Sequence, residues 1–259
     1  MSNPLKVPTF SNLVRGQTCC PIVELRQYTL HPGSRDVLIE LFDRKFVESQ
    51  EAVGMKVIGQ FRNLDDPNLF VWLRGFDDMS ARPQALQAFY GGPVWEAHRN
   101  VANATMVDFS NVLLLRPAHP TSGFSLEGSE RPPHGGNEIP KGLVVATIYH
   151  FAAPVEAGFL DFFERALKPV LIDNGASILA CFVTESSANN FPKLPVREGE
   201  NVFVWFSLFP DRTAYEHHVA ALVRSQRWRG EISEELARRL KGPPEVWKLM
   251  PTARSLLHG

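Results

Sequence analysis

The chain has 259 residues, 44% of them hydrophobic and 21% charged, which is the composition of a soluble globular protein with one large domain or two ordinary ones. Its 27 basic and 28 acidic residues give a formal charge of −1 without any block of like charge, which argues against nucleic acid and anionic membranes as partners. No apolar run is long enough to span a membrane and the start lacks a secretory segment, so we expect a cytoplasmic protein whose three cysteines stay reduced.

After a short N-terminal arm, residues 1–20, the first half alternates between strand and helix patterns. Residues 23–30 alternate as a strand, and helical spacing follows with Ser34 as the expected N-cap. We then expect strands over residues 56–62 and 69–76, a helix over 80–89, a further helical turn near Trp95, and a strand over 107–115. This β-α-β-β-α-β order is that of the ferredoxin-like unit, an antiparallel four-stranded sheet with both helices on one face.

The second half repeats this order after a stretch rich in Pro, Gly and Ser, residues 118–142, which we interpret as a linker. Its predicted elements are a strand over residues 143–151, a helix from Phe159 to Val170, strands near Ser177 and Val202, a helix over 215–223 and a strand over 246–249. Residues 252–259 form a tail.

Two blocks of the first half recur in the second half at constant offsets. Tyr28 recurs 121 positions later as Tyr149, whereas Trp72 recurs 133 positions later as Trp205, so the loop at residues 184–200 carries 12 extra residues. We therefore predict two tandem copies of one unit, domain 1 at residues 21–117 and a divergent domain 2 at residues 143–251. The expected fold is α+β, with the two ferredoxin-like units pairing sheet to sheet as a dimeric α/β-barrel within one chain.

A family resemblance rests on the motif Glu-Leu-Arg-x-Tyr-x-Leu-x-Pro-Gly at residues 24–33. Together with the strand Val71-Trp72-Leu73, Arg82 and the Trp95-x-x-His98 segment, this motif resembles the NIPSNAP family. The resemblance covers residues 21–117 well and residues 143–251 weakly. It implies the dimeric α/β-barrel fold, which also hosts cofactor-independent oxygenases, haem-handling enzymes, lyases and isomerases.

The first copy keeps polar residues where the second has lost them. Glu24, Arg26 and Arg74 correspond to Val145, Thr147 and Ser207, Lys56 and Gln60 correspond to Ser177 and Cys181, and Tyr28 and Trp72 are retained as Tyr149 and Trp205. Glu24, Arg26 and Tyr28 share one face of a strand, and we expect this face to line a cavity between the sheets, where buried charge must be paired or used. The predicted ligand-binding residues are Arg26, Arg74, Trp72, Lys56 and Gln60, and the predicted catalytic residues are Glu24, Tyr28 and His98.

Each candidate has an expected role. Arg26 and Arg74 would hold a carboxylate, enolate or phenolate, while Tyr28 would donate a hydrogen bond. Glu24 would orient an arginine or abstract a proton, and His98 is the candidate acid or base, because imidazole is the usual side chain for proton transfer in enzymes. Because metal-ligand spacing and nucleotide motifs are missing, we expect no metal and no cofactor. Haem is the alternative cofactor, with His150, His217 or His218 as its axial ligand.

Two classes of function remain open. In the first, the domain 1 barrel cavity binds an aromatic or carboxylated metabolite, and an oxygenase, isomerase, decarboxylase or dehydratase reaction proceeds without a cofactor. In the second, the protein is a non-catalytic scaffold with a packed barrel interior, and the Glu24 cluster only fixes how the two halves dock. An open interior lined by Glu24, Arg26 and Arg74 would exclude the packed scaffold, whereas a filled interior would exclude an enzyme that works in the barrel cavity. The expected partner is a small molecule, and a homo-oligomer is also compatible with the sequence.

Overall fold

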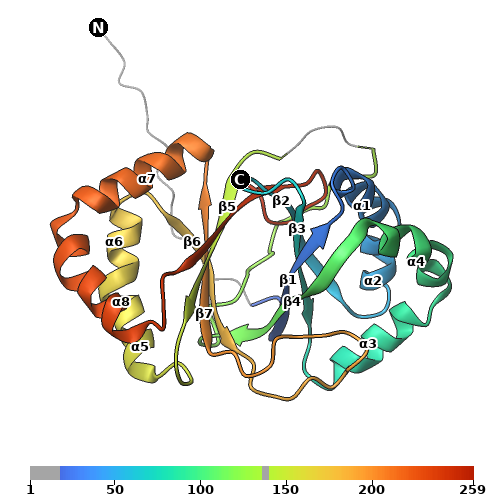
Figure 1. Ribbon diagram of the computed structural model, residues 1–259, viewed down its shortest axis with the longest axis horizontal. Helices are drawn as coiled ribbons and strands as arrows, with labels where there is room; N and C mark the ends of the chain where they lie inside the picture. Colours follow the sequence, from blue (N-terminus) through green and yellow to red (C-terminus); the bar gives the residue numbers. More distant parts are fainter. Residues whose placement is uncertain (1–17, 136–139) are drawn as a thin grey trace, which may run out of the picture.

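The computed structural model describes residues 18–135 and 140–259, and its strands close into an eight-stranded antiparallel barrel between two sets of helices (Figure 1). The order around the barrel is β1-β3-β2-β8-β5-β7-β6-β4. The first half contributes β1 (Ile22–Leu30), β2 (Lys56–Asn63), β3 (Leu69–Phe76) and β4 (Met106–Pro117), and the second half contributes β5 (Leu143–His150), β6 (Ser177–Thr184), β7 (Val202–Phe209) and β8 (Glu245–Pro251). The predicted fold class is confirmed.

The helices of each half cover the outside of that half's own strands, on opposite sides of the barrel in Figure 1. The first half has α1 (Arg35–Leu41), a π-helical turn η1 (Phe42–Phe46), α2 (Val47–Glu51), α3 (Ala81–Tyr90) and α4 (Pro93–Thr105). The second half has α5 (Ala157–Phe162), π-helical η2 (Phe163–Leu167), α6 (Lys168–Asp173), α7 (Arg212–Arg224), π-helical η3 (Trp228–Ile232) and α8 (Ser233–Arg239). Among the described residues, none of these helices is long and apolar enough to cross a bilayer.

Two local predictions need correction. Ser34 occupies the N-cap position of α1, but its side chain makes no capping hydrogen bond. The segment near Trp95 is a helix of 13 residues rather than a single turn, and Pro93 in its first turn fixes a φ angle that suits a helix start.

The two halves share topology and strand register. In the first half Arg26 pairs with Trp72 across β1 and β3, and in the second Thr147 pairs with Trp205 across β5 and β7. The halves join where β4 meets β6 and where β2 meets β8. That the halves are copies of one sequence unit stays a prediction, but equivalent positions can be compared directly in the structure.

The interior of the barrel is packed with apolar side chains. One buried cluster gathers the inward residues of both halves, among them Val23, Leu25, Leu73, Val144 and Phe206. Because side chains alternate along a strand, Glu24, Arg26 and Tyr28 point away from this interior, toward the layer beneath α1–α4. The prediction that these residues line a cavity inside the barrel is therefore wrong about the face of the sheet.

Candidate functional site

Four charged side chains meet under the helices of the first half. Glu24 and Arg26 come from β1, Arg74 from β3 and Arg82 from α3, and each is 0% exposed. The carboxylate oxygen Oε2 of Glu24 accepts from Arg26 Nη1 at 2.5 Å and from Arg74 Nε at 2.8 Å, while Oε1 accepts from Arg82 Nε at 2.7 Å. Antiparallel pairing sets part of this geometry, since Glu24 and Arg74 are register partners. Three guanidinium groups thus share one carboxylate.

The cluster carries more positive than negative charge. Burial by itself raises the pKa of Glu24, but Arg74, Arg26 and Arg82 outweigh burial and hold the pKa far below its ordinary value. Glu24 is therefore ionised at neutral pH. Three guanidinium groups against one carboxylate leave two positive charges in excess, and such buried charge is costly unless an anion joins it.

Two tyrosine hydroxyls lie beside the arginines. Arg26 Nε donates to Tyr28 Oη at 3.0 Å, and Arg74 Nη1 donates to Tyr90 Oη and to Gln50 Oε1, both at 3.3 Å. A hydroxyl that accepts a hydrogen bond from a guanidinium still has its own proton to donate. Burial raises the pKa of Tyr28, so this phenol keeps its proton at neutral pH. Tyr28 and Tyr90 can each offer one O–H donor, polarised by the charge behind it.

The same tyrosines line a cavity with two adjoining chambers. The inner chamber, about 30 Å³, lies against Trp72 and Gln50 under the helices, and the outer chamber, about 510 Å³, opens to the surface. The outer volume is in the range of about 300–1,000 Å³ typical of small-molecule sites. Both chambers share the wall formed by Tyr28, Tyr90, Trp95 and Met106, and the outer one is also lined by Gln87, Asn103, Val107, Phe109, Phe191, Lys193 and Leu194.

Buried donors without partners lie next to this wall. Arg26 Nη2, Arg74 Nη2 and Trp72 Nε1 find no hydrogen-bond acceptor among the described residues. The guanidinium carbons of Arg26 and Arg74 lie 5.6 and 5.1 Å from the Trp72 ring centre, which adds cation–π attraction. A ligand with acceptor atoms or negative charge would satisfy such donors, whereas a cation would not.

The second half of the chain closes the outer chamber. Residues 185–201 between β6 and β7, which we call the strap, cross from the second half toward α3, as the orange loop in Figure 1 shows. Arg82 Nη1 donates to Asn189 Oδ1 at 3.1 Å and to Asn190 Oδ1 at 2.8 Å. The ring of Phe191 stacks on Tyr90 with centres 6.5 Å apart. The predicted insertion at residues 184–200 thus corresponds to a segment that builds the site of the first half.

The predicted site residues divide into two groups. Glu24, Arg26, Tyr28, Trp72 and Arg74 come together as described above. The others do not reach the cavity: the Lys56 side chain is 45% exposed beside Glu51, Gln60 is buried and donates to Asp43 Oδ1 at 3.4 Å, and His98 lies with its ring centre 6.5 Å from that of Phe46. None of these three lines either chamber. Lys56 is the first residue of its strand, and His98 lies on α4 outside the chamber wall. Strand and helix patterns in the sequence do not show whether side chains at such positions face a cavity.

Three residues of the site escaped the prediction of site residues although a signal for them existed. Gln50 corresponds to Leu171 at the offset of 121, and Arg82 and Tyr90 correspond to Tyr215 and Val223 at the offset of 133. All three pairs show the same loss of charge or polarity that singled out Glu24. No sequence signal indicated that the strap contacts the first half, because an insertion marks a loop but not the surface that the loop contacts.

The histidines considered as haem ligands have other contacts. His150 Nε2 lies 2.7 Å from Glu245, the buried His218 binds the Asn174 carbonyl through Nδ1 at 2.8 Å, and His217 is exposed. None of the three lines either chamber of this cavity. Within the described residues, no group of three or more His, Cys, Asp and Glu side chains is arranged to hold a metal ion.

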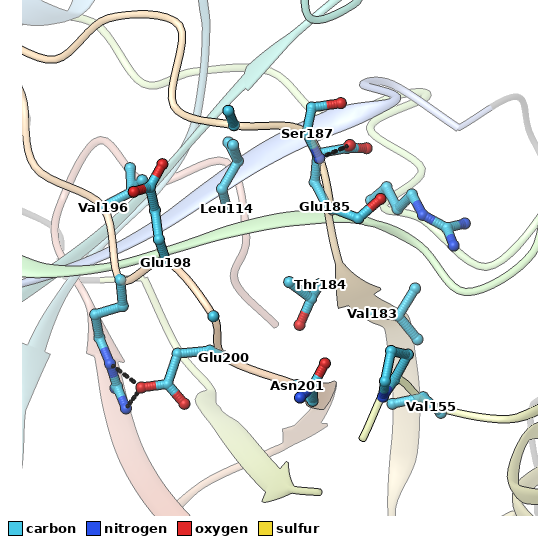
Figure 2. Close-up of a pocket in the computed structure, with 16 residues that line it drawn as sticks. Leu114, Val155, Val183, Thr184, Glu185, Ser187, Val196, Glu198, Glu200 and Asn201 are labelled. Carbon is cyan, nitrogen blue, oxygen red and sulfur yellow. Dashed lines mark hydrogen bonds and ion pairs between the residues drawn. The ribbon is translucent and has the colours of Figure 1, made fainter. Parts of the chain in front are cut away.

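A separate hollow of about 430 Å³ lies at the base of the strap, where Figure 2 shows Glu185, Glu198 and Glu200 around its rim. Arg197 pairs with Glu200 at 2.6 Å, and the Ser187 amide donates to Glu185 at 2.7 Å. These carboxylates are engaged locally and partly exposed. The hollow therefore lacks the buried, unmatched groups that mark the cavity beside Tyr28.

Comparison with known proteins supports the fold. The NIPSNAP family model matches residues 23–120. An anthrone oxidase-like protein of solved structure superposes with a TM-score of 0.56 at 16% identity, covering 92% of this chain and 95% of that chain. Candidate monooxygenases from Lactobacillus acidophilus NCFM and Fusobacterium nucleatum subsp. nucleatum ATCC 25586 superpose with TM-scores of 0.51 each, at 16% and 10% identity, covering 90% of this chain and 94% and 93% of theirs. No curated protein matches the sequence.

Proposed function

We propose that residues 23–120, which match the NIPSNAP family model, bind a small aromatic or carboxylated metabolite as an anion. The ligand would lie between the strands of the first half and helices α1–α4. The observation that carries the proposal is the buried cluster of three guanidinium groups and one carboxylate behind two cavity-lining tyrosines. An anionic ligand oxygen beside Tyr28 and Tyr90 would accept a hydrogen bond from each hydroxyl and offset part of the excess positive charge.

The same electrostatics support chemistry that needs no bound cofactor. Positive charge in a site of low dielectric lowers the pKa of a bound phenol, enol or carboxylic acid and favours its conjugate base. Preorganised donors that stabilise a developing oxyanion assist oxygenation, isomerisation, decarboxylation and dehydration alike. No carboxylate or imidazole among the described residues lines either chamber, which favours substrates that need no strong base.

Glu24 acts in this proposal as an orienting group. Both of its oxygens are occupied by guanidinium groups, and its pKa lies far below neutral. Glu24 is therefore a poor proton acceptor. Of its two predicted roles, holding Arg26, Arg74 and Arg82 in place is the one that these contacts favour.

The second candidate function is non-catalytic binding of the same class of ligand. The observation that favours it is the packed barrel interior, which leaves the cavity under α1–α4 as the place for a ligand. Oxygen uptake and product analysis with a bound phenol, without added cofactor, separate an oxygenase from a carrier.

Binding itself is tested by thermal shift and calorimetry with 2-naphthol and 2-naphthoic acid. A ligand that binds only the folded state raises the melting temperature by mass action. Tyr28→Phe should weaken binding by about tenfold to a hundredfold, because one hydrogen bond to a charged group is lost. Tyr149→Phe is the matched control, since Tyr149 is equally buried but faces Phe203 in the second half. The proposal fails if neither compound binds, or if the two variants weaken binding equally.

A further inference from the structure

The outermost part of the strap is a rigid turn at the mouth of the cavity. The amide of Leu194 donates to the carbonyl of Phe191 at 3.0 Å, and Pro192 occupies the second position of this turn, where its fixed φ is favourable. Asn189 Nδ2 donates to the Leu194 carbonyl at 2.8 Å. Phe191 and Leu194 both pack into the aromatic cluster of the first half. The backbone of Lys193, between them, is therefore held in place.

The rest of the strap is fixed to the first half at separate points. Arg82 binds Asn189 and Asn190, and Asn190 Nδ2 also donates to the carbonyl of Met79. Farther along, the Arg197 amide donates to the Val112 carbonyl at 2.8 Å. A strap with these contacts places the side chains of its turn reproducibly over the outer chamber, so the turn contributes to selectivity.

Lys193 gives the mouth its charge. It is the one charged side chain that lines the outer chamber within residues 18–135 and 140–259, and its ammonium group has no ion-pair partner among them. The inner end of the chamber is backed by the arginines behind Tyr28 and Tyr90. The rest of the wall is uncharged: Trp95, Met106, Val107, Phe109, Phe191 and Leu194 are apolar, and Gln87 and Asn103 carry neutral amides. The chamber therefore combines two positively charged features with a largely apolar wall.

We infer, resting on the proposed function, that the ligand carries two acidic groups on a flat apolar body, one for the tyrosines and one for Lys193. A phenol or enol oxygen accepts hydrogen bonds from the O–H groups of Tyr28 and Tyr90, the ring system packs on the apolar wall that includes Trp95, and a carboxylate pairs with Lys193. The chemical class is a hydroxyaryl carboxylate. Without Lys193, the described wall would offer a ligand carboxylate only the neutral amides of Gln87 and Asn103 besides the tyrosines.

Calorimetry with three probes tests this inference: 6-hydroxy-2-naphthoic acid, 2-naphthol and 2-naphthoic acid. Wild type should bind the hydroxy acid up to about fivefold more tightly than 2-naphthol, as expected for one partly exposed ion pair. Lys193→Ala should abolish this advantage, because it should weaken binding of the hydroxy acid more than binding of 2-naphthol, and Lys193→Arg should retain it. Added salt should reduce it. Lys45→Ala is the matched control, because Lys45 is an exposed lysine of the first half that lines neither chamber.

The possible failures are distinguishable. If wild type binds 2-naphthol and the hydroxy acid equally, or if Lys193→Ala weakens both alike, the two-acid inference is overturned while the proposed anion site stands. If none of the three probes binds wild type, the proposed function fails and the inference fails with it. Binding of the hydroxy acid with an advantage that disappears only in Lys193→Ala supports both.

Discussion

Replacing Glu24 with glutamine should leave three buried guanidinium groups around a neutral amide. The carboxylate pairs with Arg26, Arg74 and Arg82 at 2.5, 2.8 and 2.7 Å, and all partners are 0% exposed. Removing one partner of a buried pair costs about 3–5 kcal/mol, and here one carboxylate serves three cations. We expect Glu24→Gln to lose at least about 4 kcal/mol of a free energy of unfolding that is about 5–15 kcal/mol for ordinary domains. Urea denaturation followed by tryptophan fluorescence measures this loss.

The loss should also depend on pH. A carboxyl group whose pKa is depressed in the folded state contributes stability that is fully present above its ordinary pKa and is lost as the pH falls toward the folded value. The ordinary value is 4.5 and the folded value lies well below it. The difference in unfolding free energy between wild type and Glu24→Gln should therefore be constant near neutral pH and shrink progressively below about pH 4.5.

The second half of the chain supplies the control. Its residues at the equivalent positions suggest a quadruple variant with Glu24→Val, Arg26→Thr, Arg74→Ser and Arg82→Tyr. Replacing a whole buried ion cluster with uncharged residues is often neutral or stabilising, so this variant should be more stable than Glu24→Gln. A loss below about 1 kcal/mol in Glu24→Gln would refute the reasoning, because it is no larger than that of one neutral hydrogen bond. A quadruple variant as unstable as the single one would also refute it.

Three further outcomes are expected. Burial raises the pKa of Asp43 from 3.8 to about 6 although Arg254 opposes it, so the ionisation of Asp43 lowers stability as the pH rises through this range. Asp43→Asn should gain up to roughly 3 kcal/mol at neutral pH and nothing below pH 3.8 in urea titrations. Phe191→Ala should cost about 2–4 kcal/mol and weaken binding of an aromatic ligand about tenfold in calorimetry, because the stacking on Tyr90 is lost. His98→Ala should leave ligand affinity unchanged, and a clear loss would restore His98 as a candidate acid or base.

The fold could be predicted because several independent signals agreed. The strand predicted over residues 69–76 is β3 (Leu69–Phe76), and alternation, turn residues and the internal offsets all indicated the same order of elements. The length of α4 was missed although its apolar residues do recur with a helical period. Only Ala102 and Thr105 of this helix are buried, and Val101 is the one large apolar side chain in its second half, so no run of large apolar residues marked the end of the helix.

The face of the sheet could not be predicted from alternation. Leu25 and Arg26 are both 0% exposed, because β1 is covered by the barrel interior on one side and by helices on the other. A period of two assigns neighbours to opposite faces but does not say which face is inside when both are buried. The narrow interior of an eight-stranded barrel is filled by side chains, which favours apolar residues there and leaves the polar ones to the helix-covered face.

The contrast between the halves bears on whether the buried charges serve the fold or a ligand. The second half builds the same strand order and register with Val145 and Thr147 in place of Glu24 and Arg26, so the fold does not require these charges. A cluster that only docked the halves would lie where they join, at the β4–β6 and β2–β8 contacts, but β1 pairs with β3 and β4 of its own half. Arg82 does reach the strap, whereas Arg26 Nε and Arg74 Nη1 donate to residues that line the cavity. Charges that the fold does not need, placed behind donors on the cavity wall, are better explained by a ligand than by docking.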